Sequence, residues 1–354
     1  MHEAILYQKL KNKTVKCQVC QRRCVISDGQ VGFCLSRVNK NGQLYSLLYG
    51  IVNGHLQVDP IEKKPFYHFK PGSQVVSVGS FGCNFRCQQC LNWWTSWGQP
   101  ATANLEKLAK EKSWPLESCL EIQPEKIIDL VIEKGYQGIA LTYNEPVIWL
   151  EFAYDLAKLA KKANLYTVFV TNGSWTKESL DLIGPYLDAV NIDFKGFSKK
   201  TYTKQNAFFG EIPGLAIYAQ KKGIFLEITT LLIPGINDDP GELKKMAAWI
   251  VKNLGPDTPW NLSQYDPEAA PDNKFQIIPF TTVAQLEKAA EIGKKAGLNH
   301  IYLWAPNSGY SSSDTLCPNC KKIVIKRDGW EPSEIKITQE GKCQFCGYKL
   351  NIVL

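Results

Sequence analysis

Residues 75–90 decide the fold, and they read VVSVGSFGCNFRCQQC. A mostly apolar, β-favouring run, typical of a buried strand, leads directly into a loop that carries Cys83, Cys87 and Cys90 with the spacing C-x3-C-x2-C. Three thiolates so close together cannot fill a four-ligand site by themselves. A cubane iron–sulfur cluster held by three cysteines keeps one iron open to a further ligand. The stretch therefore predicts a strand that ends in a [4Fe-4S] site with an open position.

Cysteines elsewhere in the chain are also clustered. The sequence has twelve cysteines among 354 residues and begins without a secretory signal, so we expect a cytoplasmic protein whose thiols stay reduced. Clustered thiolates in a reducing compartment indicate metal, whereas structural cysteines would be scattered along core strands. Only Cys119 stands alone. The two outer sets are Cys17, Cys20, Cys24 and Cys34 near the start, and Cys317, Cys320, Cys343 and Cys346 near the end.

Each outer set offers four thiolates. The carboxy-terminal set consists of two C-x2-C pairs, a pattern typical of two loops that clamp one ion, and tetrahedral sulfur coordination suits zinc or a single iron. A closed four-ligand site of this kind is structural. For the amino-terminal set zinc is our first choice, with an auxiliary iron–sulfur cluster as the alternative.

Between the outer sets, apolar runs alternate with helical patterns from about residue 75 to residue 305. This alternation predicts an α/β fold, a parallel sheet with helices outside, as a barrel or an open sheet. No GxGxxG follows the first strand, which argues against a dinucleotide site. The predicted strands are Val75–Ser80, Gly138–Thr142, Tyr166–Thr171, Ala189–Asp193, Phe225–Leu232, Trp260–Gln264 and His300–Trp304, and helices are expected over 152–163, 242–254 and 285–296.

We expect three domains. Residues 1–70 form a four-cysteine module with a lead-in, 71–306 the α/β domain, and 307–354 a zinc-ribbon or rubredoxin-like module that begins with a Gly- and Ser-rich linker at 307–313. The interval after the first strand is long, and Trp94–Leu120 is interpreted as an insertion. The net charge of +7 is compatible with an anionic partner or cofactor, and the sequence contains no uninterrupted apolar stretch that would span a membrane.

The C-x3-C-x2-C loop after a first strand resembles that of the radical S-adenosylmethionine (SAM) superfamily. The resemblance implies a partial or near-complete (β/α) barrel, a [4Fe-4S] cluster and SAM. Reductive cleavage of SAM would yield a 5′-deoxyadenosyl radical that abstracts hydrogen from a substrate, here unidentified, with a peptide or protein among the candidates. The class is an oxidoreductase fed by a flavodoxin- or ferredoxin-type electron donor. No side chain is assigned as catalytic, because the radical is on the cofactor.

Over the whole chain, the sequence is similar to the radical SAM enzymes of the AmmeMemoRadiSam group and to pyruvate formate-lyase-activase relatives. The matching stretches are Cys17–Cys24, Val31–Cys34, Asp59–Pro65, Gly82–Cys90, Thr142–Pro146 and Cys317–Cys320. One departure is Gln89, where the family usually has an aromatic residue.

Further site residues are expected where later strands end. Glu145, beside Asn144, is our candidate to bind the methionine amino group, since a carboxylate suits that task; the alternative is a helix-terminal carboxylate. Asn172 is a candidate cofactor ligand or a turn residue. Asp193 and Lys195 alternate with apolar neighbours, so both should point to the same side, toward the cofactor or into a plain salt bridge.

Two other functions stay open at this stage. One is a glycyl-radical-enzyme activase. Activases commonly have extra iron–sulfur cysteines soon after the first cluster, whereas here Cys119 alone lies between Cys90 and Cys317. The other is a zinc-ribbon nucleic-acid-binding protein without catalysis, to which basic charge and ten tryptophans would be suited. Such a module would need a fourth ligand beside the central triple, and none is close in sequence.

Overall fold

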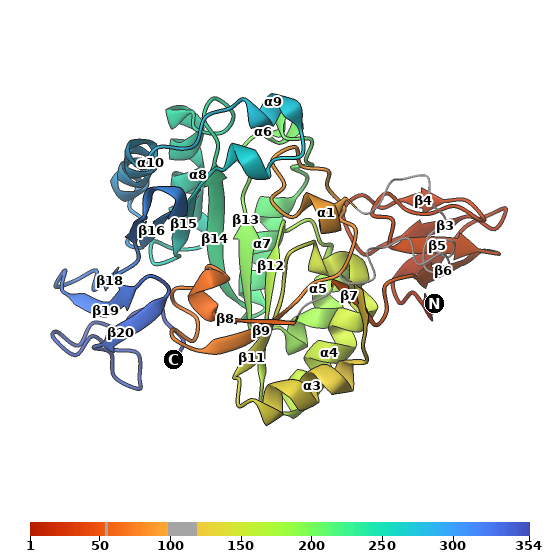
Figure 1. The fold of residues 1–354 in the computed structure, drawn as a ribbon, viewed down its shortest axis with the longest axis horizontal. Helices are drawn as coiled ribbons and strands as arrows, with labels where there is room; N and C mark the ends of the chain where they lie inside the picture. Colours follow the sequence, from red (N-terminus) through yellow and green to blue (C-terminus); the bar gives the residue numbers. More distant parts are fainter. Residues whose placement is uncertain (54–55, 98–118) are drawn as a thin grey trace.

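The computed structural model describes residues 1–53, 56–97 and 119–354. Its centre is a nine-stranded sheet with the order β17-β16-β15-β14-β13-β12-β11-β9-β8 (Figure 1). Seven neighbouring strands are parallel, and the edge strands β8 (Gln57–Pro60) and β17 (Tyr310–Ser312) are antiparallel to them. The parallel strands are β9 (Gln74–Val78), β11 (Gly138–Leu141), β12 (Tyr166–Thr171), β13 (Ala189–Asp193), β14 (Phe225–Leu232), β15 (Trp260–Gln264) and β16 (Ile301–Ala305).

The predicted strands of the α/β region are confirmed. The bounds of β12, β13, β14 and β15 agree with the prediction, and those of β9, β11 and β16 differ by one or two residues. All four residues of β11 are buried, as expected for a strand covered on both faces.

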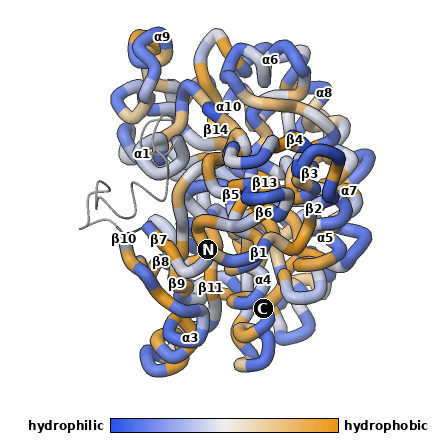
Figure 2. The backbone as a smooth tube through the Cα atoms, turned by 90° about the vertical axis from the view of Figure 1, so that its right-hand side faces the viewer, coloured by the Kyte–Doolittle hydropathy of each residue, from blue (hydrophilic) through white to orange (hydrophobic). Residues whose placement is uncertain are grey.

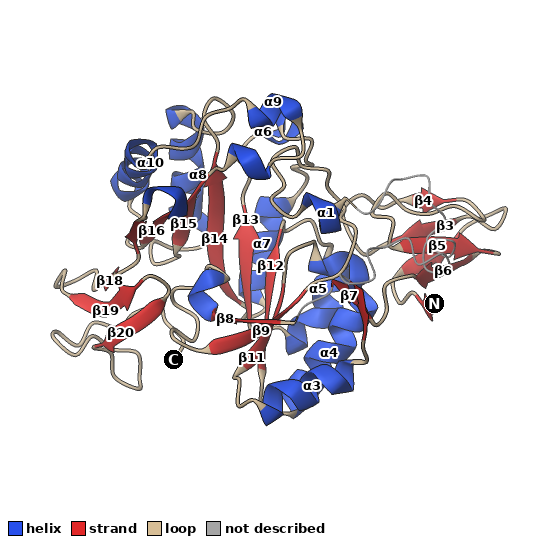
Figure 3. Ribbon diagram, in the orientation of Figure 1, coloured by secondary structure: helices blue, strands red, loops and turns tan. Residues whose placement is uncertain are grey.

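Helices cover the outer side of the sheet (Figure 3). Their amphipathic sequences explain this position, because the apolar face of α4 is buried while lysines occupy its last turn. Helix α10 begins with a capping box at Thr282 and ends at Gly297 in the left-handed conformation. The helices are α1 (Trp93–Ser96), α3 (Pro124–Glu133), α4 (Leu150–Lys162), α5 (Lys177–Ile183), α6 (Lys199–Lys204), α7 (Ile212–Lys221), α8 (Pro240–Asn253), α9 (Asn273–Gln276) and α10 (Val283–Ala296).

The sheet is strongly curved. The carboxyl ends of β11 to β16 line one cavity together with the loop that follows β9. Among the described strands, the edges β8 and β17 do not pair with each other, so the curved sheet is a partial barrel that is not closed. No helix in the described parts of the chain is long and apolar enough to cross a membrane, and surface helices such as α3 alternate between hydrophilic and hydrophobic residues (Figure 2).

The amino-terminal region forms two small antiparallel sheets beside the main one, on the right in Figure 1. Their orders are β1-β6-β5 and β2-β3-β4. The strands are β1 (His2–Glu3), β2 (Tyr7–Lys9), β3 (Val15–Cys17), β4 (Val25–Ile26), β5 (Arg37–Lys40) and β6 (Gln43–Ser46); a further pair joins β7 (Ile51–Asn53) to β10 (Cys119–Glu121). Strand β8 belongs to the predicted lead-in but pairs with β9 in the main sheet. Most of the predicted insertion, residues 98–118, lies outside the described residues.

The carboxy-terminal module is a three-stranded sheet of β18 (Thr315–Leu316), β19 (Ile323–Asp328) and β20 (Glu331–Ile335) with a small apolar core of its own. A buried ion pair between Arg327 and Glu62, at 3.2 Å, joins it to the segment after β8. The prediction of a linker at 307–313 was wrong, because three of these residues form β17, which pairs with β16.

Candidate functional site

A cavity of about 300 Å³ lies at the carboxyl ends of the parallel strands. The central triple forms part of its wall: Cys83 and Cys87 are buried, and Cys90 is half-buried. Strand ends converge at this edge in any parallel α/β sheet, which is why the side chains that follow separate strands meet here.

The loop that carries the triple is held by Asn144. Its side-chain oxygen accepts from the Ser80 backbone N–H at 3.1 Å, and its amide group donates to the carbonyls of Phe81 and Gly82 at 3.2 and 2.9 Å. Gly82 has φ +75, a conformation that favours glycine. Asn144, predicted to bind the cofactor, thus positions the cysteine loop from the edge of the cavity.

The chemistry of the triple fits an iron–sulfur cluster. Burial raises the pKa of the Cys87 thiol to about 12, so this sulfur is anionic only when a cation compensates its charge. Three sulfurs on the wall of an open cavity leave room for a further ligand on the cavity side.

Glu145 is buried at the same cavity. One carboxylate oxygen accepts from the Val147 N–H at 3.2 Å, and both oxygens accept from the Thr171 hydroxyl, at 2.8 and 3.0 Å; the second oxygen also accepts from the Asn172 N–H at 2.8 Å. Burial raises its pKa to about 7 despite these donors. The carboxylate therefore caps the 3₁₀ turn at Pro146–Trp149, as the alternative predicted, and also lines the cavity.

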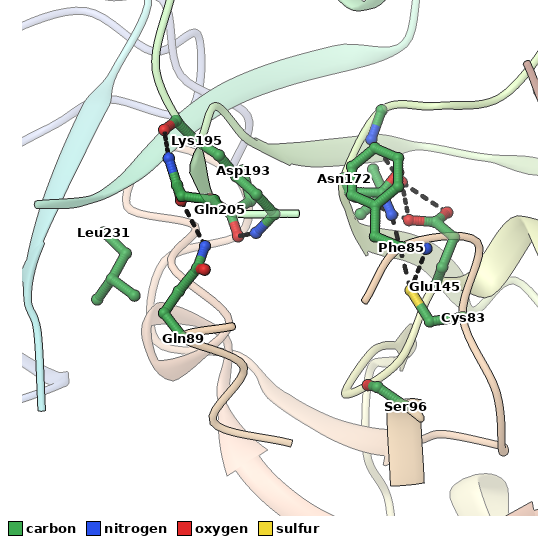
Figure 4. Close-up of polar contacts among 12 residues, drawn as sticks. Cys83, Phe85, Gln89, Ser96, Glu145, Asn172, Asp193, Lys195, Gln205 and Leu231 are labelled. Carbon is green, nitrogen blue, oxygen red and sulfur yellow. Dashed lines mark hydrogen bonds and ion pairs between the residues drawn. The ribbon is translucent and has the colours of Figure 1, made fainter. Parts of the chain in front are cut away.

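The other predicted residues lie on the same wall (Figure 4). Asn172 donates to the Asn84 side chain at 2.8 Å, beside Cys83. Lys195 and Asp193 do point to the same side and form a salt bridge of 2.6 Å. Asp193 lines the cavity, and within the described residues no donor reaches its buried Oδ1.

Two residues of the site were not predicted as contributors. The Gln89 amide donates to the Gln205 side chain, which donates to the Lys195 carbonyl (Figure 4). Gln89 therefore ties the cysteine loop to the segment that follows β13, through a residue 116 positions away. The one signal in the sequence was that Gln89, beside Cys90, replaces the aromatic residue usual in the family. Nothing near Gln205 indicated a role.

The structure brings the four cysteines of each outer set together, but the spacing of the sulfurs differs between the two sets. In the carboxy-terminal set, Cys317 and Cys346 have sulfurs 3.6 Å apart, and Cys320 and Cys343 have sulfurs 3.8 Å apart. All four sulfurs lie within 4.8 Å of one another, as a single tetrahedral ion requires. The amino-terminal set instead lines a separate small cavity.

A curved α/β sheet with a three-cysteine loop at its carboxyl edge defines a class of iron–sulfur-dependent enzymes. Residues 77–247 match the Radical SAM superfamily. Over the whole of both chains, the protein is 36% identical to an uncharacterised protein of Methanocaldococcus jannaschii. A second protein of that organism, provisionally named a glycyl-radical enzyme activating enzyme, is 25% identical over 50% of this chain and 63% of its own length.

Two solved structures are also similar. A domain of pyruvate-formate lyase-activating enzyme from Bacteroides vulgatus is 19% identical with a TM-score of 0.40, over 47% of this chain and 98% of its own. Streptococcus suis SuiB bound to the precursor peptide SuiA is 14% identical with a TM-score of 0.47, over 69% and 51%. The chain belongs to the radical SAM superfamily, whose members use a [4Fe-4S] cluster and SAM.

Proposed function

We propose that the protein cleaves SAM reductively at a [4Fe-4S] cluster held by Cys83, Cys87 and Cys90, and that the resulting 5′-deoxyadenosyl radical abstracts hydrogen from a substrate. The observation that carries this proposal is the position of the three sulfurs on the wall of the strand-end cavity. When bound, the cluster supplies the electron that breaks the sulfonium C–S bond. The family assignment favours this enzyme over a zinc-ribbon binding protein.

The surrounding side chains would orient SAM. Glu145 presents a carboxylate to accept from the methionine amino group, and Asn172 holds that carboxylate through its backbone N–H. The free oxygen of Asp193 would accept from a hydroxyl group, while the other oxygen accepts from Lys195. The electron would come from a flavodoxin- or ferredoxin-type donor.

Replacement of Cys83, Cys87 and Cys90 by alanine tests the proposal. Reconstituted, reduced wild-type protein should convert SAM to 5′-deoxyadenosine, and the triple variant should not. Circular dichroism and retention of the carboxy-terminal metal verify that the variant is folded. Formation of 5′-deoxyadenosine at the wild-type rate by the folded variant would disprove the assignment.

A narrower candidate is a glycyl-radical-enzyme activase, favoured by the names of two relatives that are 25% and 23% identical to this chain. An activase takes its hydrogen atom from a glycine Cα of a partner protein. Incubation of the reduced enzyme and SAM with a glycyl-radical enzyme of the same organism should then produce a glycyl radical signal in electron paramagnetic resonance (EPR) spectra. SAM cleavage without that signal would be consistent with the broader radical SAM function and would reject the activase function.

A further inference from the structure

The four amino-terminal cysteines converge on one cavity, although they are spread over eighteen positions of the sequence. Three of them are buried, and Cys24 is half-buried. The wall also includes Arg22, Arg37 and Asn84, together with apolar side chains. Four cysteines that line one cavity, in a chain where four other cysteines lie close enough to hold a single ion, indicate a ligand-binding site.

The spacing of these sulfurs differs from that of a one-ion site. A Zn–S bond of about 2.3 Å places the sulfurs of a tetrahedral zinc site about 3.8 Å apart, and the carboxy-terminal set meets this requirement at 3.6 and 3.8 Å. In the described residues, the carboxy-terminal set is the one group of three or more such ligands whose atoms all lie within 4.8 Å of one another. The sulfurs of the amino-terminal set and those of the central triple do not meet this 4.8 Å limit, and a wider separation suits a ligand of several atoms.

Arg37 indicates the charge of that ligand. Its side chain is 1% exposed and forms two parallel hydrogen bonds to Glu151, at 2.9 and 2.8 Å. These bonds use the two terminal nitrogens, and within the described part of the chain Nε has no acceptor. A buried donor without a partner costs about 1–3 kcal/mol. An anionic ligand held by thiolates in this cavity would supply the missing acceptor.

The cavity lies directly behind the loop of the central triple. Asn84, next to Cys83, is part of its wall, and its carbonyl accepts from Arg22. Arg86 donates to the carbonyls of Cys83 and Phe33, at 2.6 and 3.0 Å. A methyl group at Gly82 would collide with the Cys34 carbonyl, so the two cysteine loops touch without intervening side chains.

We infer that Cys17, Cys20, Cys24 and Cys34 hold an iron–sulfur cluster instead of a zinc ion. The wide spacing of the sulfurs and the wall shared with the loop of the central triple favour a cluster. We therefore no longer prefer zinc at this site, as we did from the sequence. The inference does not depend on SAM cleavage, because it concerns the ligand of a cavity that is separate from the strand-end cavity.

The variant with alanine at Cys83, Cys87 and Cys90 provides the test, because it removes the central cluster and leaves the amino-terminal ligands intact. After anaerobic reconstitution it should retain about four irons and about four acid-labile sulfides. Additional replacement of Cys17 and Cys20 by serine should remove both. Acid-labile sulfide distinguishes a cluster from a single iron in the carboxy-terminal set. A folded triple variant with two zinc ions and no sulfide would overturn the inference.

Wild-type protein gives an independent measurement that needs no cysteine variant. The reduced protein should show two EPR-active clusters, and addition of SAM should change the signal of one of them, since a cluster with four cysteine ligands has no open iron. A single cluster signal, wholly altered by SAM, would contradict the inference. Failure of SAM to change either signal, with two clusters present, would contradict the proposed function alone.

Discussion

The buried Glu145 carboxylate has two roles: it caps the 3₁₀ turn at Pro146–Trp149 and it lines the strand-end cavity. Its motif was recognisable because Thr142–Pro146 follows a strong strand pattern. Its donors come from Thr171 and Asn172, a turn that follows a different strand, and no local pattern predicts that pairing. The link from Gln89 to Gln205 was equally hidden, since it depends on how the end of α6 and the cysteine loop approach in space.

The raised pKa of Glu145 leads to a pH-dependent prediction. In the free protein the carboxyl group titrates near pH 7, held there by burial against the lowering effects of its donors and Lys195. A carboxylate that accepts from the SAM amino group must be ionised, so SAM affinity should rise between about pH 6 and 8. Replacement of Glu145 by Gln should abolish this rise and weaken binding by about 1.5–3 kcal/mol.

Glu227→Gln is the matched control for that titration. Glu227 is buried with a pKa also raised to about 7 by burial, but it accepts from the Tyr67 and His68 backbone and does not line the strand-end cavity. In both wild-type residues a raised pKa means that stability falls as pH rises from about 4.5 to 7. An equal loss of SAM affinity in both variants would show that Glu145 acts through stability and not through contact.

At the scale of elements, the parallel strands were predictable because each is a local apolar run. The short strands of the amino-terminal module were not, since strands of two to four residues gain their stability from partners elsewhere. β17 lay in a Gly- and Ser-rich stretch that resembles a linker, and its pairing with β16 makes it a strand. Because β17 is an edge strand of the sheet, its sequence can be polar.

The link between the amino-terminal module and α4 yields a stability prediction. Arg37 on β5 and Glu151 on α4 form an ion pair whose side chains are 1% and 0% exposed. Glu151→Gln leaves a buried charge without its partner and should lower the free energy of unfolding by about 3–5 kcal/mol. Glu178→Gln removes an exposed partner of Arg23 and should cost at most about 1 kcal/mol. Denaturant titration of both variants compares the two losses; similar values would refute the burial argument.

The carboxy-terminal module should depend on its ion. Its apolar core is small, and three of the nine buried or partly buried residues of that core are cysteines of the set. We propose a structural zinc here. Chelation should therefore increase amide hydrogen exchange in β18, β19 and β20, with β12 and β13 unaffected. Unchanged exchange in these three strands after complete zinc loss would show that packing against the main sheet suffices.

Charge is distributed unevenly over the whole molecule. Residues 1–46 contain eight Lys and Arg against two Asp and Glu, a net charge of +6 out of the total of +7. The sequence total alone indicated only a mildly basic protein. The fold places these residues in a module that projects to one side (Figure 1), and the four-cysteine cavity is lined mainly by residues of this module. This arrangement suits an acidic electron-donor protein that docks on the module.

Charge reversal tests this docking face. Lys9, Lys11 and Lys13 are exposed, and their joint replacement by glutamate should slow reduction of the enzyme by flavodoxin severalfold and weaken the salt dependence of that rate. Reduction by dithionite, a small anion that needs no docking, should change far less. Replacement of exposed Lys244, Lys245 and Lys252 on α8 is the matched control, with the same change in net charge. Stopped-flow traces that slow equally in both variants would assign the effect to net charge and reject the module as the donor's docking face.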